Sequence, residues 1–122
     1  SFGTQTAAIG CGGDPDGSFT ESWNGSSWTE VNNMNVTREG IGSAGLQPAG
    51  LIFGGSASPK QQTESWNGSS WANENILNTA RSDTAGSGTS TLALCFGGRP
   101  PTTDATEEWN NEGLFSRTVT LG

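Results

Sequence analysis

The chain has 122 residues, of which 30% are hydrophobic, and it contains 19 Gly, five Trp and five Phe but no His. Twelve acidic residues against five basic ones give a net charge of −7, which argues against nucleic acid or an anionic membrane surface as partner, since both need clustered Lys and Arg. No apolar run has the length of a spanning helix, so no transmembrane segment is expected.

An internal repeat divides the chain. The nine residues 20–28 recur unchanged at 63–71, an offset of 43, and a looser copy follows at 106–110. Three glycine pairs keep nearly the same period: Gly12-Gly13, Gly54-Gly55 and Gly97-Gly98. A fixed period of this size indicates stacked supersecondary units rather than one irregular core.

Within one period the residues predict four short antiparallel strands. The segment 39–46 is rich in Gly and suits a crowded inner strand. After a turn, 51–53 form a continuous apolar run, typical of a strand buried on both faces. A polar loop leads to a strand ending at Trp66, and Asn67-Gly68 then favours a tight hairpin turn into a strand that starts at Trp71. No window has a helical period, so almost no helix is expected.

Four such strands per period of about 43 residues are typical of a propeller blade. The order of Arg38, an apolar run ending in Gly54-Gly55, and then Trp66 and Trp71 resembles the kelch motif. The other two units match it with Gly12, Gly13, Trp23 and Trp28, and with Arg81, Gly97, Gly98, Trp109 and Phe115. The resemblance implies an all-β fold of kelch-like β-propeller blades, each a four-stranded antiparallel sheet. We expect about three blades: 1–34, which lacks its innermost strand, 35–77 and 78–122.

Closed propellers usually contain four to eight blades, so three blades leave sheet faces and strand edges uncovered. We expect closure by self-association, in which two chains form a six-bladed ring and the first partner is a second copy of the chain. Two alternatives stay open. The chain is a segment of a longer array, or the arcs join head to tail into a filament.

The charged and aromatic residues of the repeat are interpreted as structural. Arg38 and Arg81 recur at matched positions, as do Glu21, Glu64 and Glu107. Because a ligand site needs only one copy, each Arg is expected to pair with a carboxylate or to cap strand carbonyls. The periodic Trp side chains are expected to pack between blades, although an exposed Trp would suit sugar stacking or a binding hot spot.

Two further residue types are assigned no special chemistry. Cys11 and Cys95 lie in apolar strand patterns, which favours small buried thiols over a disulfide. Asn24, Asn35 and Asn67 begin N-glycosylation sequons, but the first and third are already explained as hairpin turns.

The loops between each glycine pair and the next Trp differ from unit to unit. In a propeller they share one face with the loops that lead into the inner strands, and in kelch proteins that face commonly binds partners. The candidate binding residues are Asp14, Asp16, Phe19, Lys60, Arg99 and Asp104. Asp14 and Asp16 resemble the opening of a calcium loop, but the later acidic ligands are missing. A Pro-Gly turn is therefore the interpretation, and no metal or cofactor is expected.

The sequence thus predicts a non-enzymatic binding or structural module that assembles from copies of itself. The composition, rich in Gly, Ser, Thr and Asn, is similar to that of adhesins and tail-fibre-like proteins, which favours an extracellular or virion-associated location. A glycan-binding lectin or adhesin-type module and a filament-forming subunit are the alternatives. An enzyme is least favoured, because the commonest general base, His, is absent.

Overall fold

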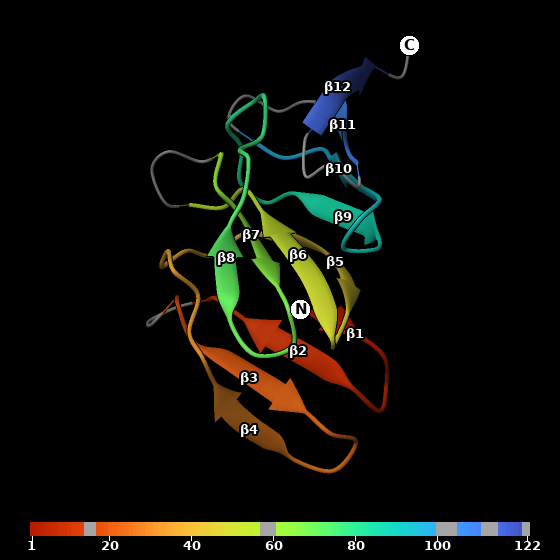
Figure 1. The fold of residues 1–122 in the computed structure, drawn as a ribbon. Helices are drawn as coiled ribbons and strands as arrows, with labels where there is room; N and C mark the ends of the chain where they lie inside the picture. Colours follow the sequence, from red (N-terminus) through yellow and green to blue (C-terminus); the bar gives the residue numbers. More distant parts are fainter. Residues whose placement is uncertain (14–16, 57–60, 100–104, 111–114, 121–122) are drawn as a thin grey trace.

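The computed structural model describes residues 1–13, 17–56, 61–99, 105–110 and 115–120, with backbone only at 105 and 115–120. This part of the chain forms three antiparallel four-stranded sheets and no helix (Figure 1). It therefore contains no helix long and apolar enough to cross a membrane. The all-β prediction is confirmed.

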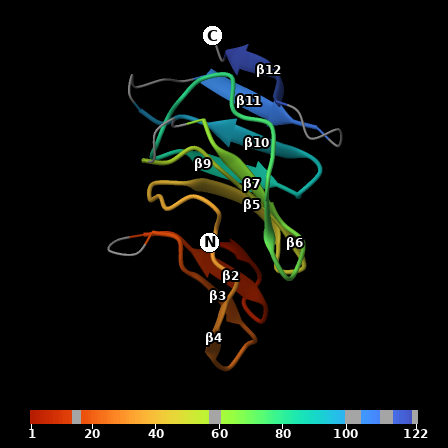
Figure 2. The same ribbon diagram turned by 60° about the vertical axis from the view of Figure 1, so that its left-hand side comes forward.

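The sheets follow one another along the chain. The first contains β1 (Phe2–Gly3), β2 (Ala8–Cys11), β3 (Thr20–Trp23) and β4 (Trp28–Val31). The second contains β5 (Gly42–Leu46), β6 (Ala49–Phe53), β7 (Thr63–Trp66) and β8 (Trp71–Asn73). The third contains β9 (Ala85–Gly88), β10 (Ala93–Phe96), β11 (Ala105–Trp109) and β12 (Phe115–Thr120). Figure 2 shows the second sheet stacked between the other two.

The first sheet is more complete than the sequence predicts. The strand β1 pairs with β2 through Phe2 and Ile9, and it occupies the place of the innermost strand that was expected to be missing. A strand of only two residues is held in place here because Phe2 is buried against the second sheet. Gly3 ends this strand with a φ of +128° and Gly88 ends β9 at +116°, while Gly45, one residue before the end of β5, has a φ of +112°. Only glycine adopts this backbone conformation readily.

The hairpin after β7 differs from the predicted tight turn. Trp66 pairs with Trp71, which leaves a four-residue loop. Gly68 has a φ of +96°, while Asn67 Oδ1 accepts hydrogen bonds of 2.9 Å from the backbone N–H groups of the two following serines. Asn24 makes the same contacts in the first sheet. The hairpin was predicted correctly and its turn type wrongly, because the spacing between the two Trp leaves four residues to be spanned.

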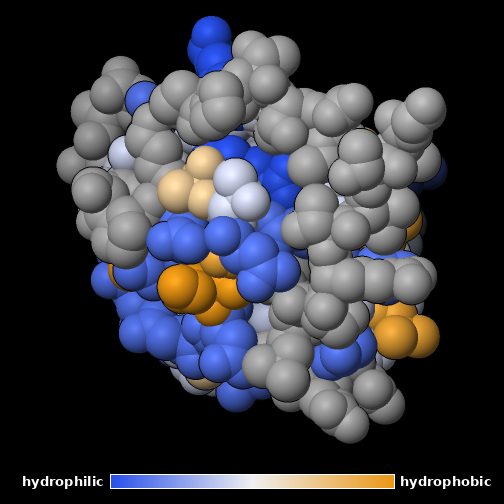
Figure 3. All heavy atoms as spheres, turned by 90° about the horizontal axis from the view of Figure 1, so that it is seen from above, coloured by the Kyte–Doolittle hydropathy of each residue, from blue (hydrophilic) through white to orange (hydrophobic). Residues whose placement is uncertain are grey.

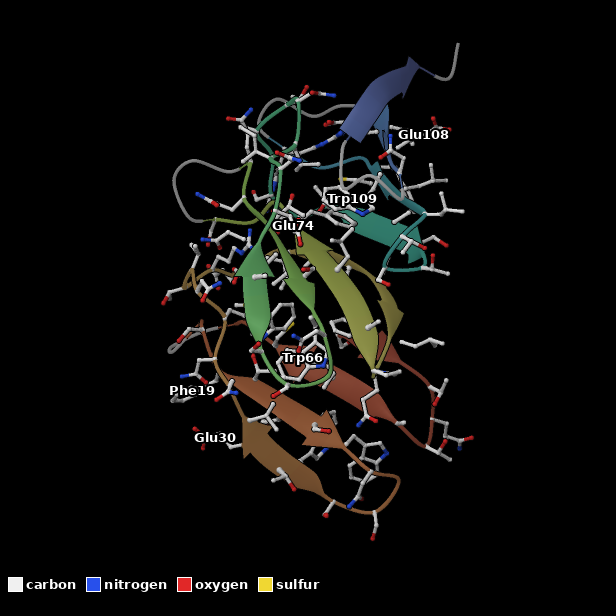
Figure 4. The ribbon with its side chains drawn as sticks, viewed as in Figure 1. Phe19, Glu30, Trp66, Glu74, Glu108 and Trp109 are labelled. Carbon is white, nitrogen blue, oxygen red and sulfur yellow. The ribbon has the colours of Figure 1, made fainter. Side chains whose placement is uncertain are left out.

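Hydrophobic side chains fill the two spaces between adjacent sheets. The first space holds Phe2, Ile9, Met34, Ile52, Trp66 and Trp71, and the second holds Ala44, Leu51, Phe53, Leu77, Ala93, Cys95 and Trp109. Figure 4 shows Trp66 in the first space and Trp109 in the second. Successive side chains of a strand point to opposite faces, so β6 contributes side chains to both spaces between the sheets. Residues 51–53 are each 0% exposed, which confirms that this apolar run is buried on both faces.

Phenylalanine rings lie against glycines at both junctions. A Cβ atom on Gly50 would overlap the ring of Phe2, and a Cβ atom on Gly86 would overlap the ring of Phe53. The small residues of the inner hairpins therefore allow the rings of the neighbouring sheet to approach the backbone closely.

Candidate interaction surfaces

Each junction between sheets contains a buried Arg–Glu pair. Arg38 Nη2 lies 2.9 Å from Glu64 Oε2, and Arg81 Nη2 lies 2.5 Å from Glu107 Oε2, with all four side chains 0% exposed. Arg38 Nη1 also donates to the carbonyl of Gly54 at 2.9 Å. Arg81 Nη1 likewise donates to the carbonyl of Gly97 at 3.1 Å. The prediction that each Arg pairs with a carboxylate or caps strand carbonyls is confirmed, and both residues do both.

The surroundings of Arg38 show that its role is structural. Burial lowers the pKa of Arg38, and the neighbouring Glu64 opposes that shift. Glu64 also accepts a hydrogen bond of 2.6 Å from the backbone N–H of Asn35. The carbonyl of Arg38 in turn accepts from Gly13 of the first sheet. The residue thus ties two sheets together and offers no accessible charge to an acidic ligand.

The first Trp of every unit holds its own sheet together. Trp23, Trp66 and Trp109 donate their indole N–H to the carbonyls of Gln5, Gln47 and Ser90, at 3.0, 2.9 and 3.1 Å. Each acceptor lies in the hairpin between the first two strands of the same sheet. The bond therefore links the third strand of a sheet to its inner hairpin.

The second Trp of the second unit crosses to the neighbouring sheet. Trp71 Nε1 donates to Thr20 Oγ1 at 3.0 Å, and its ring meets Phe2 edge-on with centroids 6.2 Å apart. Its counterpart Trp28 is 50% exposed, because no sheet lies against that face in the described part of the chain. The packing prediction is therefore confirmed for Trp66, Trp71 and Trp109, whereas Trp28 packs against no neighbouring sheet within the single chain and its packing between blades stays a prediction.

In the part of the chain that the structure describes, one face of the first sheet and one face of the third have no other sheet against them. We call the face that a sheet turns toward the next sheet in the chain its forward face, and the opposite face its rear face. The forward face of the third sheet exposes Leu94 (40%) and Phe96 (37%), and the rear face of the first sheet exposes Trp28 and Glu21. Viewed from the end of the third sheet, hydrophobic atoms are visible among hydrophilic ones (Figure 3).

The open forward face is hollowed. A depression of about 360 Å³ lies at the end of the third sheet beside the hairpin between β9 and β10. It is lined by Ser87, Leu94 and Glu108 of the forward face, by Leu92 of the hairpin, and also by Ala93 and Trp109. Figure 4 shows Glu108 on the side of this sheet away from the second sheet, whereas Trp109 lies between the two sheets. The sequence predicted uncovered sheet faces but not these particular residues, because 94–96 carry the same apolar pattern as the buried run 51–53. The one available signal was that 94–96 belong to the last unit.

The described loops lie together, as the sequence predicts. Gly13 donates from its backbone N–H to the carbonyl of Arg38, and Gly55 donates in the same way to Arg81. Ser82 and Arg99 exchange two backbone hydrogen bonds of 2.7 and 2.9 Å. The loops that follow the glycine pairs therefore lie beside segments that lead into an inner strand, of the next unit for Gly13 and Gly55 and of the same unit for Arg99.

The structure describes two of the predicted binding residues. Phe19 is 48% exposed in the loop before β3 (Figure 4). Arg99 is exposed after β10, with Nε 2.6 Å from Asp83 Oδ2, an exposed ion pair of small energetic value. Phe19 lies in a loop of the first sheet and Arg99 in a loop of the third, and the second sheet is stacked between those two sheets (Figure 2). The other four residues, Asp14, Asp16, Lys60 and Asp104, lie outside the described residues.

Neither described thiol is activated. Burial raises the pKa of Cys11 to about 11 and that of Cys95 to about 12, and both thiols are free. The thiolate is the nucleophilic form, so these residues are inert near neutral pH. The described residues contain no group of three or more His, Cys, Asp or Glu that could hold a metal ion.

Comparison with known proteins assigns no family: no family model matches the chain, and no curated protein matches it.

Proposed function

We propose that the chain is a non-enzymatic, kelch-like propeller module with a binding or structural role, which assembles from copies of itself. Two chains would contribute three blades each. The observation that carries the proposal is the pair of open faces at the ends of the stack. Both internal junctions bury a forward face against a rear face, and the chain exposes one face of each kind.

The exposed side chains give this assembly its driving force. Trp28, Leu94 and Phe96 are each between 37% and 50% exposed, whereas the matching residues Trp71, Leu51 and Phe53 of the second sheet are buried at the internal junctions. Burying apolar surface contributes about 25 cal/mol per Å². Large exposed apolar faces mark interaction sites on soluble proteins. Each open face of the chain could be covered by the opposite open face of a second copy, as a forward face covers a rear face at each internal junction.

Assembly would also gather the variable loops on one face of the ring. The loops that carry Phe19 and Arg99 differ between units, and a protein or glycan ligand would be recognised there. Chemistry at the described thiols is disfavoured by their raised pKa values, which supports binding over catalysis.

Size-exclusion chromatography with light scattering, over a wide concentration range, tests the proposal. The expected mass is twice the chain mass of 12.6 kDa, and a closed ring should keep that mass as the concentration rises. A folded protein with the mass of one chain at every concentration would contradict self-association. An open-ended mass distribution would replace the ring with the filament alternative.

A second candidate function is glycan binding, in an extracellular or virion-associated setting. The observation that favours it is the exposed ring of Trp28, whose centroid lies 5.3 Å from that of Trp23 at an interplanar angle of 43°. Exposed Trp rings are favoured binding residues. A glycan array separates the two functions, because a lectin should lose its signal in Trp28→Ala while its mass stays that of one chain.

A further inference from the structure

We infer that the open forward face of the third sheet binds the open rear face of the first sheet of a second copy, head to tail, in the geometry of the internal junctions. This inference rests on the proposed self-association and goes further, because it names the two surfaces and the residues that meet. The argument depends on residues that hold equivalent positions in the three sheets.

The junction between the first and second sheets is the template. The forward face of the first sheet presents Phe2, Ile9 and Thr20. The rear face of the second sheet places Trp66 and Trp71 against them, with Trp71 bonded to Thr20 and edge-on to Phe2. An aromatic pair on the rear face therefore fills the space above an inner strand and its neighbour.

The third sheet has residues at the equivalent positions of its forward face, and no described aromatic pair covers them. Its strand register pairs Leu94 with both Ser87 and Glu108, as Ile9 of the first sheet pairs with both Phe2 and Ser22. Leu94, Ser87 and Glu108 line the depression of about 360 Å³. The depression thus lies where a rear-face aromatic pair lies at the internal junction. Trp23 and Trp28 are the pair that the chain leaves available.

The hydrogen-bond donors and acceptors also match. Thr106 pairs with Phe96 in the third sheet as Thr20 pairs with Cys11 in the first. Thr106 is therefore the hydroxyl that Trp28 of a second copy would reach, as Trp71 reaches Thr20. The second internal junction lacks this bond. There Thr63 Oγ1 is buried without a hydrogen-bond partner. The residue that pairs with Trp109 in the third unit is Phe115, whose side chain has no N–H group to donate.

A second polar contact follows from the same template. Gln47 Nε2 reaches back across the first junction to Ser22 Oγ at 2.7 Å and to the Trp23 carbonyl at 3.0 Å. The counterpart of Gln47 in the first unit is Gln5, which is exposed, and the counterpart of Ser22 in the third unit is Glu108. An amide donor would meet a carboxylate acceptor, which is a compatible pair.

The test places a charge on each face separately and then mixes the variants. Trp28→Arg alters only the rear face and Leu94→Arg only the forward face. Ile76→Arg is the matched control, because Ile76 is 50% exposed and lies between β8 and β9, outside both faces. Each face variant alone should show the mass of one chain, and the control should keep twice that mass. An equimolar mixture of the two face variants should regain the doubled mass, because one junction then has two native faces.

Circular dichroism at the same concentrations shows whether each variant remains folded, and a misfolded chain would not be rescued by mixing. A gentler pair, Trp28→Phe and Thr106→Val, removes only the expected hydrogen bond. Each should weaken dimerisation about fivefold for each of the two junctions of the ring, and the double variant should be no weaker than either single one.

Head-to-tail binding is overturned if the native chain dimerises and either face variant dimerises equally well alone, or if mixing restores nothing. In both cases self-association itself still stands. A native chain that stays a folded monomer removes both the inference and the proposed function.

Discussion

At the scale of single residues, identical sequence acquires different roles from its surroundings. The nine residues 20–28 and 63–71 are the same, yet Glu64 is fully buried with Arg38 whereas Glu21 is exposed. The carboxylate at this position of the repeat forms a buried ion pair only where the segment before the inner strand contains an arginine beside it. The pair Glu64 and Glu21 therefore gives a built-in comparison within one chain.

Glu64→Gln should lower the free energy of unfolding by about 3 kcal/mol, because it leaves the buried charge of Arg38 without its counterion. The matched control is Glu21→Gln, which changes an exposed carboxylate in the same sequence context. Both substitutions are made in the Leu94→Arg background, so that no second copy covers Glu21, and the control should alter stability by less than about 0.5 kcal/mol. Urea unfolding measures both. Equal effects of the two substitutions would show that the buried pair is not what stabilises the junction.

The thiols give a pH-dependent prediction. Their folded pKa values, about 11 for Cys11 and about 12 for Cys95, lie above the ordinary value of 9.0. Their contribution to stability is fully present below pH 9 and is lost as the pH rises toward 11 and 12, because the unfolded chain releases these protons first. The urea midpoint should therefore fall over this range. Cys95→Ala should make the decline shallower, and an unchanged slope would contradict the assigned cause.

At the scale of the elements, each sheet depends on close approach between hairpins. The indole of the first Trp in a unit bonds its own inner hairpin, while Phe2 and Phe53 lie against Gly50 and Gly86 of the next sheet. Gly50 and Gly86 are needed because they have no side chain and so leave room for the Phe rings. A special backbone conformation is not the reason, since neither residue has a positive φ.

Gly50→Ala should destabilise the fold by about 1–3 kcal/mol, since the new methyl group overlaps the ring of Phe2. Gly10→Ala is the control: it also lies in a strand, but its Cβ would meet only the ring of Trp28, at an ordinary 3.4 Å. Thermal unfolding compares the two. Phe2→Leu should relieve part of the cost of Gly50→Ala, and a purely additive double variant would argue against the overlap as its cause.

At the scale of the whole molecule, the repeat period was enough to predict four-stranded antiparallel sheets in the second and third units, three strands of the first, and almost no helix. The positions of the strands could be predicted, because the apolar run 51–53 and the recurring Trp residues mark strands in the local sequence. The repeat period could not predict exposure at Trp28, Leu94 and Phe96, because burial there depends on whether another sheet is present and not on the local sequence. It also missed the two-residue strand β1, whose place depends on the burial of Phe2 between sheets.

Hydroxyl-radical footprinting of the native protein tests the central claim most directly, because it reports how accessible each side chain is in solution. In the single chain Trp28 is as exposed as Ile76, and Leu94 and Phe96 are nearly as exposed as Phe19. If a second copy covers the open faces, Trp28, Leu94 and Phe96 should be oxidised slowly, while Phe19 and Ile76 should react at the rate of exposed residues. Rapid oxidation of Trp28, Leu94 and Phe96 at high protein concentration would contradict the account.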